Sequence, residues 1–171
     1  MRGISVFAGV ALAMLVVASS AQAQGLPRQW RWCGNDDSER SIDACSAIIE
    51  SSRKTQTGKT LAEAYTYRGN SYADKGETAK AIADFTHAIN LDPVRDEALV
   101  GRGVQYYNLG DYKHAVADFA AAIRLNPSEA VDWAWRSRAK AHLGDADGAN
   151  ADMLHAHSLD PDVEDELPGT E

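Results

Sequence analysis

The sequence predicts an all-α protein, an α-solenoid of three helix-turn-helix repeats preceded by a capping helix. Three prolines, Pro93, Pro127 and Pro161, stand 34 residues apart, and each follows a leucine and an aspartate or asparagine. Other residues recur in the same phase, namely Gly76, Gly110 and Gly144, then Ala81, Ala115 and Ala149, then Ala88, Ala122 and Ala156. A fixed period near 34 residues with helical patterning is typical of stacked helix-turn-helix units.

Residues 1–23 have the pattern of a cleavable export signal. Arg2 supplies a positive charge, residues 4–18 are almost all apolar, and the phrase AQA at 21–23 is a small-x-small cleavage pattern. We therefore expect the mature chain to start at Gln24 and to be periplasmic or secreted, with no membrane insertion after cleavage. A transmembrane anchor is the alternative, but an apolar run of about 15 residues is short for a bilayer.

Residues 24–60 predict an N-terminal capping segment with one helix and one disulfide. Cys33 and Cys45 are the two cysteines of the chain, and an even count in an exported chain favours a bridge between them. A zinc site would need two further ligands, and no histidine lies near either cysteine in the sequence. Residues 38–51 carry apolar side chains at helical spacing, so they should form a helix that covers the open face of the first full repeat.

Residues 61–163 are expected to hold three repeats, at 62–95, 96–129 and 130–163. Each repeat has a first helix, a glycine turn and a second helix that stops before the proline, because proline disfavours helix at the preceding residue. The turn glycine accepts the left-handed conformation that ends the first helix, and the acid after it favours the start of the second. The last segment, 164–171, is acidic with no basic residue, a composition that favours disorder.

These patterns make the chain resemble a tetratricopeptide-repeat (TPR) protein of the exported bacterial type. The residues at the family's signature positions in the first two repeats are Tyr65, Gly69, Tyr72, Ala81, Phe85, Ala88 and Pro93, then Leu99, Gly103, Tyr106, Ala115, Phe119, Ala122 and Pro127. In the third repeat they are Trp133, Ala149, Ala156 and Pro161. The resemblance implies a right-handed solenoid whose first helices line a concave groove that holds a partner polypeptide.

The third repeat departs from the family's pattern at three positions. Ser137 stands in place of glycine, Lys140 in place of an aromatic residue and Met153 in place of phenylalanine. Its second helix is also the most polar of the three. Because the terminal repeat of a solenoid needs a face that tolerates water, we expect this helix to act as the C-terminal cap.

The resemblance also places a set of first-helix residues in the concave groove. They are Glu63, Thr66, Asn70, Asp74, Glu97, Val100, Val104, Tyr107, Asn108, Val131, Ala134, Arg138 and His142. This set changes from acidic in the first repeat, through apolar with one tyrosine, to weakly basic in the third. We therefore expect an extended or helical peptide with apolar anchors and with basic residues at the acidic end. The family's clamp for a C-terminal carboxylate needs several basic residues with asparagine, and only Asn70 and Arg138 match it.

No constellation for catalysis or metal binding stands out, so we expect neither an enzyme nor a cofactor. The five histidines lack metal-ligand spacing, and neither a phosphate-binding glycine loop nor a nucleophile elbow occurs. The phrase DADG at 145–148 resembles part of a calcium loop, but the further acidic ligands are missing. The charged residues that recur once per repeat are interpreted as structural ion pairs between helices, and they are Arg68, Arg102 and Arg136 with Asp84, Asp118 and Asp152.

The charge balance argues against nucleic acid and against a strongly anionic membrane surface as partners. Without residues 1–23 the chain holds 16 basic and 25 acidic residues, a formal charge of −9. We expect a non-catalytic interaction module or scaffold of the periplasm that binds a partner peptide segment in the groove. A self-associating homodimer without a groove ligand is the alternative. An enzyme of unrecognised type is a remote alternative, since three repeats offer an open trough.

Overall fold

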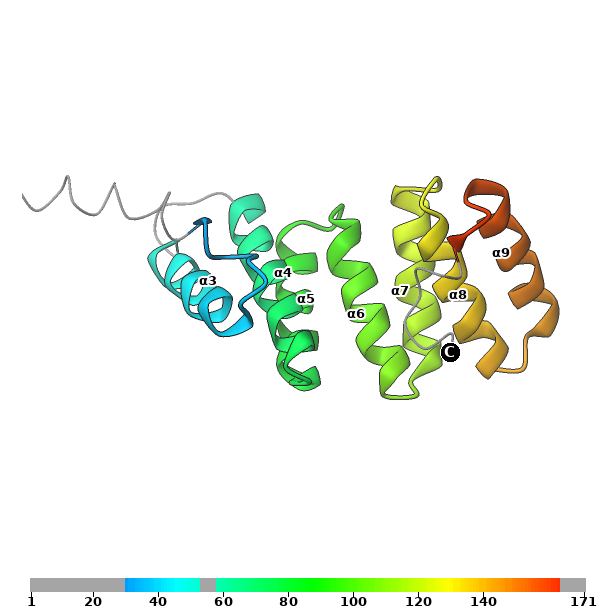
Figure 1. Ribbon diagram of the computed structural model, residues 1–171, viewed down its shortest axis with the longest axis horizontal. Coiled ribbons are helices and arrows are strands. Elements are labelled where there is room, and N and C mark those ends of the chain that lie inside the picture. Colours follow the sequence, from blue (N-terminus) through cyan, green and yellow to red (C-terminus); the bar gives the residue numbers. More distant parts are fainter. Residues whose placement is uncertain (1–29, 53–57, 164–171) are drawn as a thin grey trace, which may run out of the picture.

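The computed structural model describes residues 30–52 and 58–163, and the regular elements in these ranges are helical. In chain order the helices are α3 (Ser38–Ser52), α4 (Gly58–Asp74), α5 (Thr78–Leu91), α6 (Asp96–Asn108), α7 (Tyr112–Leu125), α8 (Ala130–His142) and α9 (Ala146–Leu159). Consecutive helices pack against each other from α3 to α9, so they form one elongated stack (Figure 1). The predicted α-solenoid is confirmed.

The predicted export signal at 1–23 and the acidic tail at 164–171 lie outside the described residues. Within the described ranges, no helix combines the length and the apolar character needed to cross a bilayer.

The glycine turns adopt the predicted left-handed conformation. The backbone angle φ is 71° at Gly76, 76° at Gly110 and 82° at Gly144. Two of these glycines are followed by Asp111 and Asp145, whose carboxylates accept backbone N–H bonds from the first turn of the next helix. Since a side chain is strained at these angles, glycine itself fixes where each first helix ends.

Within the first two repeats, a buried phenylalanine ring lies directly on helical glycines. A Cβ atom added to Gly69 would sit 2.8 Å from Phe85 Cε1, and one added to Gly101 would sit 2.6 Å from Phe85 Cζ. The same contact recurs between Gly103 and Phe119, at 2.9 Å from Cε1. These distances are shorter than any normal carbon contact, so the glycines are what lets the helices approach so closely.

The predicted structural ion pairs are confirmed. Each repeat joins its two helices by a bidentate guanidinium–carboxylate pair with N–O distances of 2.7 to 2.8 Å, and the pairs are Arg68–Asp84, Arg102–Asp118 and Arg136–Asp152. The aspartate side chains of these pairs are no more than 8% exposed. Breaking such a buried pair would leave an uncompensated charge, so the pairs hold the helices of a repeat in register.

Two of the arginines also reach back to the preceding helix pair or capping helix. Arg68 Nη1 donates to Ser46 Oγ on α3 at 3.0 Å, and Arg102 Nη1 donates to Thr86 Oγ1 on α5 at 3.1 Å. Helix α7 of the second repeat has Ala120 at the position that Thr86 occupies on α5. The contact between the second and third repeats therefore lacks this hydroxyl acceptor and depends on side-chain packing instead.

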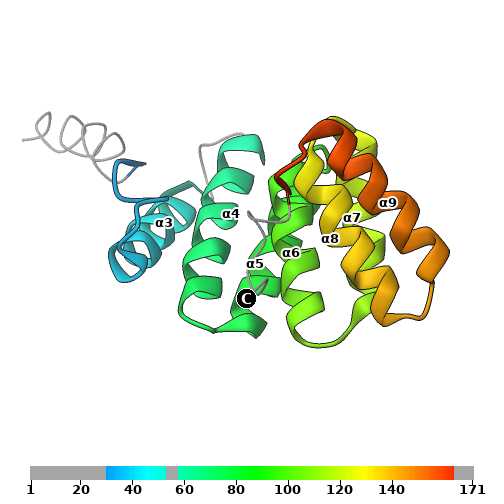
Figure 2. The same cartoon turned by 45° about the vertical axis from the view of Figure 1, so that its right-hand side comes forward.

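The described part of the predicted capping segment contains a helix and a disulfide. Cys33 and Cys45 form a disulfide, and α3 covers the predicted residues 38–51. Ile48 on α3 is fully buried in a small core that also contains Ala64 of α4. Figure 2 shows α3 and α9 at opposite ends of the stack. Helix α3 therefore covers the open end of the first full repeat, and the disulfide ties the segment before α3 to that helix.

The third repeat compensates for its departures from the pattern with polar bonds. Ser137 Oγ donates to the carbonyl oxygen of Ala149 at 2.7 Å, and Lys140 Nζ lies 2.8 Å from Asp152 Oδ2. Val163, just beyond α9, is fully buried against the core of this repeat. The last helix pair is thus held by hydrogen bonds and a second ion pair where the other repeats use glycine and aromatic packing.

Candidate functional site

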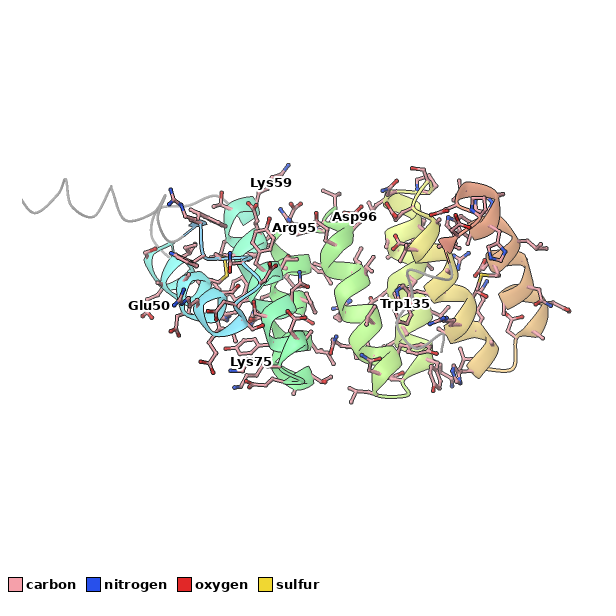
Figure 3. All side chains as sticks on the ribbon, viewed as in Figure 1. Glu50, Lys59, Lys75, Arg95, Asp96 and Trp135 are labelled. Carbon is pink, nitrogen blue, oxygen red and sulfur yellow. A yellow bond between two sulfur atoms is a disulfide. The ribbon has the colours of Figure 1, made fainter. Side chains whose placement is uncertain are left out.

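One side of the stack is formed by the first helix of each pair. Helix α4 contacts α6, and α6 contacts α8, although a second helix lies between them in the chain. An array in which the first helices crowd together curves with these helices on its inner side. Figure 3 shows Asp96 at the start of α6 and Trp135 in the middle of α8. The inner side therefore has the geometry of an open groove.

Near the N-terminal ends of α6 and α8 this side is hollowed by a pocket of about 420 Å³. We call it the acidic pocket, and its lining residues are Asn70, Asp96, Glu97, Val100, Gly101, Glu129, Val131 and Asp132. Four of them, Asn70, Glu97, Val100 and Val131, are predicted groove residues. The structure thus brings predicted residues from all three first helices to one place.

Asp132 is the most unusual residue of the acidic pocket. Its side chain lines the pocket, yet the residue is only 3% exposed. Within the described part of the chain it makes no hydrogen bond and no ion pair. Burial raises the pKa of its carboxyl to about 7, and repulsion from Glu129 and Asp96 adds to this effect. The pocket therefore contains a buried acid, in the first turn of α8, that has no ion-pair partner among the described residues.

Asp132 is not among the residues predicted from the sequence, although the repeat period carries a signal for it. The residues one and two repeats earlier are Ala98 and Ala64, and both are fully buried. The solenoid thus keeps a small apolar residue at this place, and the third repeat substitutes an ionisable one. A comparison of the repeats position by position could have identified it.

At the other end of the groove, a group of rings joins α6, α7 and α8. We call Tyr107, Tyr112, Trp135 and His142 the aromatic cluster. The Tyr107 hydroxyl lies 3.0 Å from His142 Nε2, and the Tyr112 and His142 rings stack with centroids 4.3 Å apart. Tyr107 also meets Trp135 edge to face at 5.3 Å, and the Arg138 guanidinium lies over the Trp135 ring at 5.7 Å. Three predicted groove residues, Tyr107, Arg138 and His142, therefore meet here.

Two of the predicted groove residues lie beneath the surface. Thr66 is 1% exposed and donates its hydroxyl to the carbonyl oxygen of Ala62 at 2.9 Å. Ala134 is fully buried. Because a small side chain at these places fits between packed helices, both support the wall of the groove and offer no surface to a ligand.

The remaining predicted groove residues are accessible. Asp74 and Asn108 are exposed near the ends of α4 and α6. Glu63 and Val104 are half-buried, and Glu63 accepts a weak hydrogen bond from the Tyr67 hydroxyl at 3.4 Å. They extend the surface on either side of the acidic pocket and the aromatic cluster.

In residues 30–52 and 58–163, no group of three or more histidine, cysteine, aspartate or glutamate side chains is placed to hold a metal ion. The pocket carboxylates surround a cavity and do not converge on one point. Their arrangement suits an organic cation with an apolar body better than a bare ion.

Comparison with protein families gives a match to the tetratricopeptide repeat at residues 62–93 and again at 96–129. A comparison with curated protein sequences gives no match.

Several solved structures are similar to this chain. The second TPR of Spaghetti (RPAP3), bound to the HSP90 peptide SRMEEVD, is 27% identical with a TM-score of 0.59, over 60% of this chain and 94% of that chain. The first TPR domain of the human RPAP3 protein is 26% identical with a TM-score of 0.57, over 62% and 86%. The MamA protein is 18% identical with a TM-score of 0.70, over 88% and 82%, which shows a shared fold.

Proposed function

The chain is a tetratricopeptide-repeat protein, and we propose on this premise that it binds a segment of a partner polypeptide along the inner sides of α4, α6 and α8. The observation that carries this proposal is the similarity of the chain to the second TPR of Spaghetti (RPAP3), which was solved with a bound HSP90 peptide. The open groove that the described residues form suits a binding module better than an enzyme.

The peptide that this groove takes differs in charge from SRMEEVD, which contains three acidic residues. Here Asp96, Glu97 and Glu129 line the acidic pocket, so an acidic segment would be repelled at that end. Val100 in the acidic pocket, Tyr107 in the aromatic cluster and Val104 on the same helix offer apolar surface along α6. The proposed ligand is therefore a segment with apolar anchors and a net positive charge.

The proposed location is outside the cytoplasm, in the periplasm or the surrounding medium. The Cys33–Cys45 disulfide supports this location, because structural disulfides persist in oxidising compartments. The export-signal pattern of residues 1–23 supports it independently. Cell fractionation followed by N-terminal sequencing of the recovered protein tests both points. A protein recovered from the cytoplasm with Met1 intact would contradict them.

The groove assignment is tested with two variants. Val104→Glu combined with Tyr107→Ala alters the middle of the groove, and Ala83→Glu places the same new charge on the exposed side of α5. Immobilised chains are exposed to extract of the native cells, and the captured proteins are quantified by mass spectrometry. We expect the groove variant to lose at least one partner that the control and the unaltered chain retain. Equal capture by all three folded chains would contradict the groove.

Self-association is the second candidate function, and Leu154 is the observation that favours it. This side chain on α9 is 72% exposed, and it stands two repeats after Thr86, which contacts Arg102 of the following repeat. Leu154 therefore lies where a further helix would pack. Light scattering across a dilution series would detect a dimer, and Leu154→Asp would abolish it. A monomer at all concentrations would eliminate this candidate.

A further inference from the structure

We propose that the acidic pocket receives one basic side chain, a lysine or an arginine, of the partner polypeptide, and that the Asp132 carboxylate pairs with it. The proposal rests on the proposed function, because it assigns one residue of the peptide to one place in the groove. Ala64 and Ala98 show that a buried alanine satisfies the fold at this place, so the solenoid does not need the carboxylate of Asp132.

The Asp132 carboxylate differs from the other buried aspartates in its surroundings. The buried aspartates on the second helices, Asp84, Asp118 and Asp152, each pair with an arginine at 2.7 to 2.8 Å. Asp132, at 3% exposure, makes no hydrogen bond or ion pair within residues 30–52 and 58–163. Since an unpaired buried charge is costly, the raised pKa of this carboxyl is the expected response. A cation entering the pocket would supply the missing pair.

The neighbouring charges strengthen the preference for a cation. Asp96 and Glu129 raise the pKa of Asp132 further by repulsion, and in the described ranges neither forms an ion pair. Arg95 lies close by, but its Nη1 pairs with Glu97 Oε2 at 2.7 Å. The pocket therefore keeps three carboxylates for which this chain supplies no ion-pair partner in its described part, and an added positive charge would relieve all three.

The apolar lining selects the kind of cation. Val100 and Val131 line the same cavity of about 420 Å³ that the carboxylates surround. A lysine or arginine side chain has a flexible hydrocarbon stem that packs on such surface while its charged end reaches an acid. A hydrated metal ion would gain nothing from the valines. The pocket therefore fits the amphipathic side chain of a basic residue.

The first experiment uses peptides chosen by the protein itself. A phage-displayed library of random 12-residue peptides is selected on the unaltered chain, and the best peptide is synthesised with each basic residue replaced in turn by norleucine. Affinities are measured against the unaltered chain, Asp132→Asn and the control Asp147→Asn on the exposed face of α9. Asn keeps the shape of the side chain and removes its charge, so the fold should persist.

We expect Asp132→Asn to weaken the peptide roughly ten- to a hundredfold, as for a charge-assisted bond, with Asp147→Asn unchanged. One norleucine peptide should bind the unaltered chain more weakly than the parent peptide does. This peptide should bind Asp132→Asn with the same affinity as it binds the unaltered chain. Equal losses for every peptide, or a selected peptide that contains no basic residue, would overturn the proposal.

A second measurement separates the pocket from the groove. The ¹³C shift of the Asp132 carboxyl is followed by NMR during titration with n-butylguanidinium and, as a control, n-butanol. A shift with the guanidinium alone supports the cation preference even if the library yields no peptide, in which case the proposed function fails and the pocket chemistry stands. No shift with either compound overturns the pocket assignment. A dimer that dissociates in Asp132→Asn would show that the basic side chain comes from a second copy, which contradicts the assignment to a partner polypeptide.

Discussion

The second and third repeats share a backbone arrangement but hold it with different chemistry. In the second, the Phe119 ring fills the space above Gly103. In the third, Ser137 donates to a carbonyl oxygen of α9, and Lys140 adds an ion pair to Asp152. The turn glycines and the prolines that end the second helices recur in both repeats. The comparison teaches that the turns set the geometry of a repeat, while the contact between its helices can be apolar or polar.

The two repeats differ also at the start of their first helices. Ala98 is fully buried in the second repeat, and Asp132 occupies the same place in the third. The alanine stabilises the stack, whereas the acid is uncompensated in the described structure. A residue that opposes the local rule of its repeat is expected where binding and stability compete.

The largest effect that the comparison predicts is for Phe119→Ala. Removing this fully buried ring should lower the free energy of unfolding by about 3 to 5 kcal/mol, the usual range for a buried phenylalanine. Met153→Ala, at the same position of the third repeat, should have a clearly smaller effect because Met153 is only half-buried. Urea unfolding followed by circular dichroism measures both. Equal losses would show that the third repeat depends on apolar packing as much as the second.

The next effect concerns Asp152, which pairs with both Arg136 and Lys140. Asp152→Asn should lower the free energy of unfolding by about 3 kcal/mol, because two cations lose their counter-charge. Asp147→Asn, on the exposed face of the same helix, is the control and should change little. An unchanged stability for Asp152→Asn would contradict the polar account of the third repeat.

Lowering the pH should remove the stabilisation that the Asp152 ion pairs provide. Burial alone would raise the pKa of Asp152, but hydrogen bonds from Arg136 and Lys140 hold it below its ordinary value. A lowered pKa stabilises the folded state above the pKa of the unfolded chain, about 4, and the gain is lost as pH falls through the folded pKa. Between about pH 5 and pH 2 the free energy of unfolding should therefore fall less for Asp152→Asn than for the unaltered chain.

A gain in stability is expected for Asp132→Ala, which restores the alanine of the other repeats. The pKa of Asp132 is raised to about 7, so ionisation opposes folding increasingly as pH rises from about 4 to about 7. We expect a gain of about 2 kcal/mol at pH 8 and almost none below pH 4, since each pKa unit is worth about 1.4 kcal/mol and water in the pocket offsets a part. Thermal unfolding at the two pH values measures this difference. A loss of stability at pH 8 would show that Asp132 has a structural role.

The smallest effect is expected for Ser137→Ala. The substitution removes the hydrogen bond to the Ala149 carbonyl oxygen and should cost about 1 kcal/mol. Ser158→Ala, which removes a hydroxyl from the exposed end of α9, should be neutral. A loss near zero for Ser137→Ala would mean that the serine is only a tolerated replacement for glycine.

The arrangement of helices could be predicted from the sequence because its determinants are local. A glycine at positive φ and a proline after the last turn end a helix wherever they occur, and three equal intervals between them define three helix pairs. The Cys33–Cys45 disulfide could be predicted for a similar reason, since two cysteines allow a single pairing. These inferences need no knowledge of how distant residues meet.

The surface of the groove could be predicted less well, because exposure depends on neighbours in other repeats. Thr66 and Ala134 are placed on the inner side by the period, and packing against adjacent helices buries them. The meeting of Tyr107 with Trp135 requires the stacking distance between α6 and α8. Asp132 could not be predicted as a pocket residue because aspartate is rarely buried, so its sequence position alone indicates an exposed side chain.

The Cys33–Cys45 disulfide makes the two ends of the helical array different. A linear array loses order from an end inward, since a unit at the end has one neighbour fewer than a unit in the middle. The disulfide closes a loop inside the capping segment, so a cap that detaches from α4 keeps part of its order, whereas α9 contains no cysteine. We therefore expect unravelling to begin more often at α9 than at α3. A protease or an unfolding motor should therefore meet less resistance at the carboxyl-terminal end of the array. Reduction of the disulfide should make the two ends more alike.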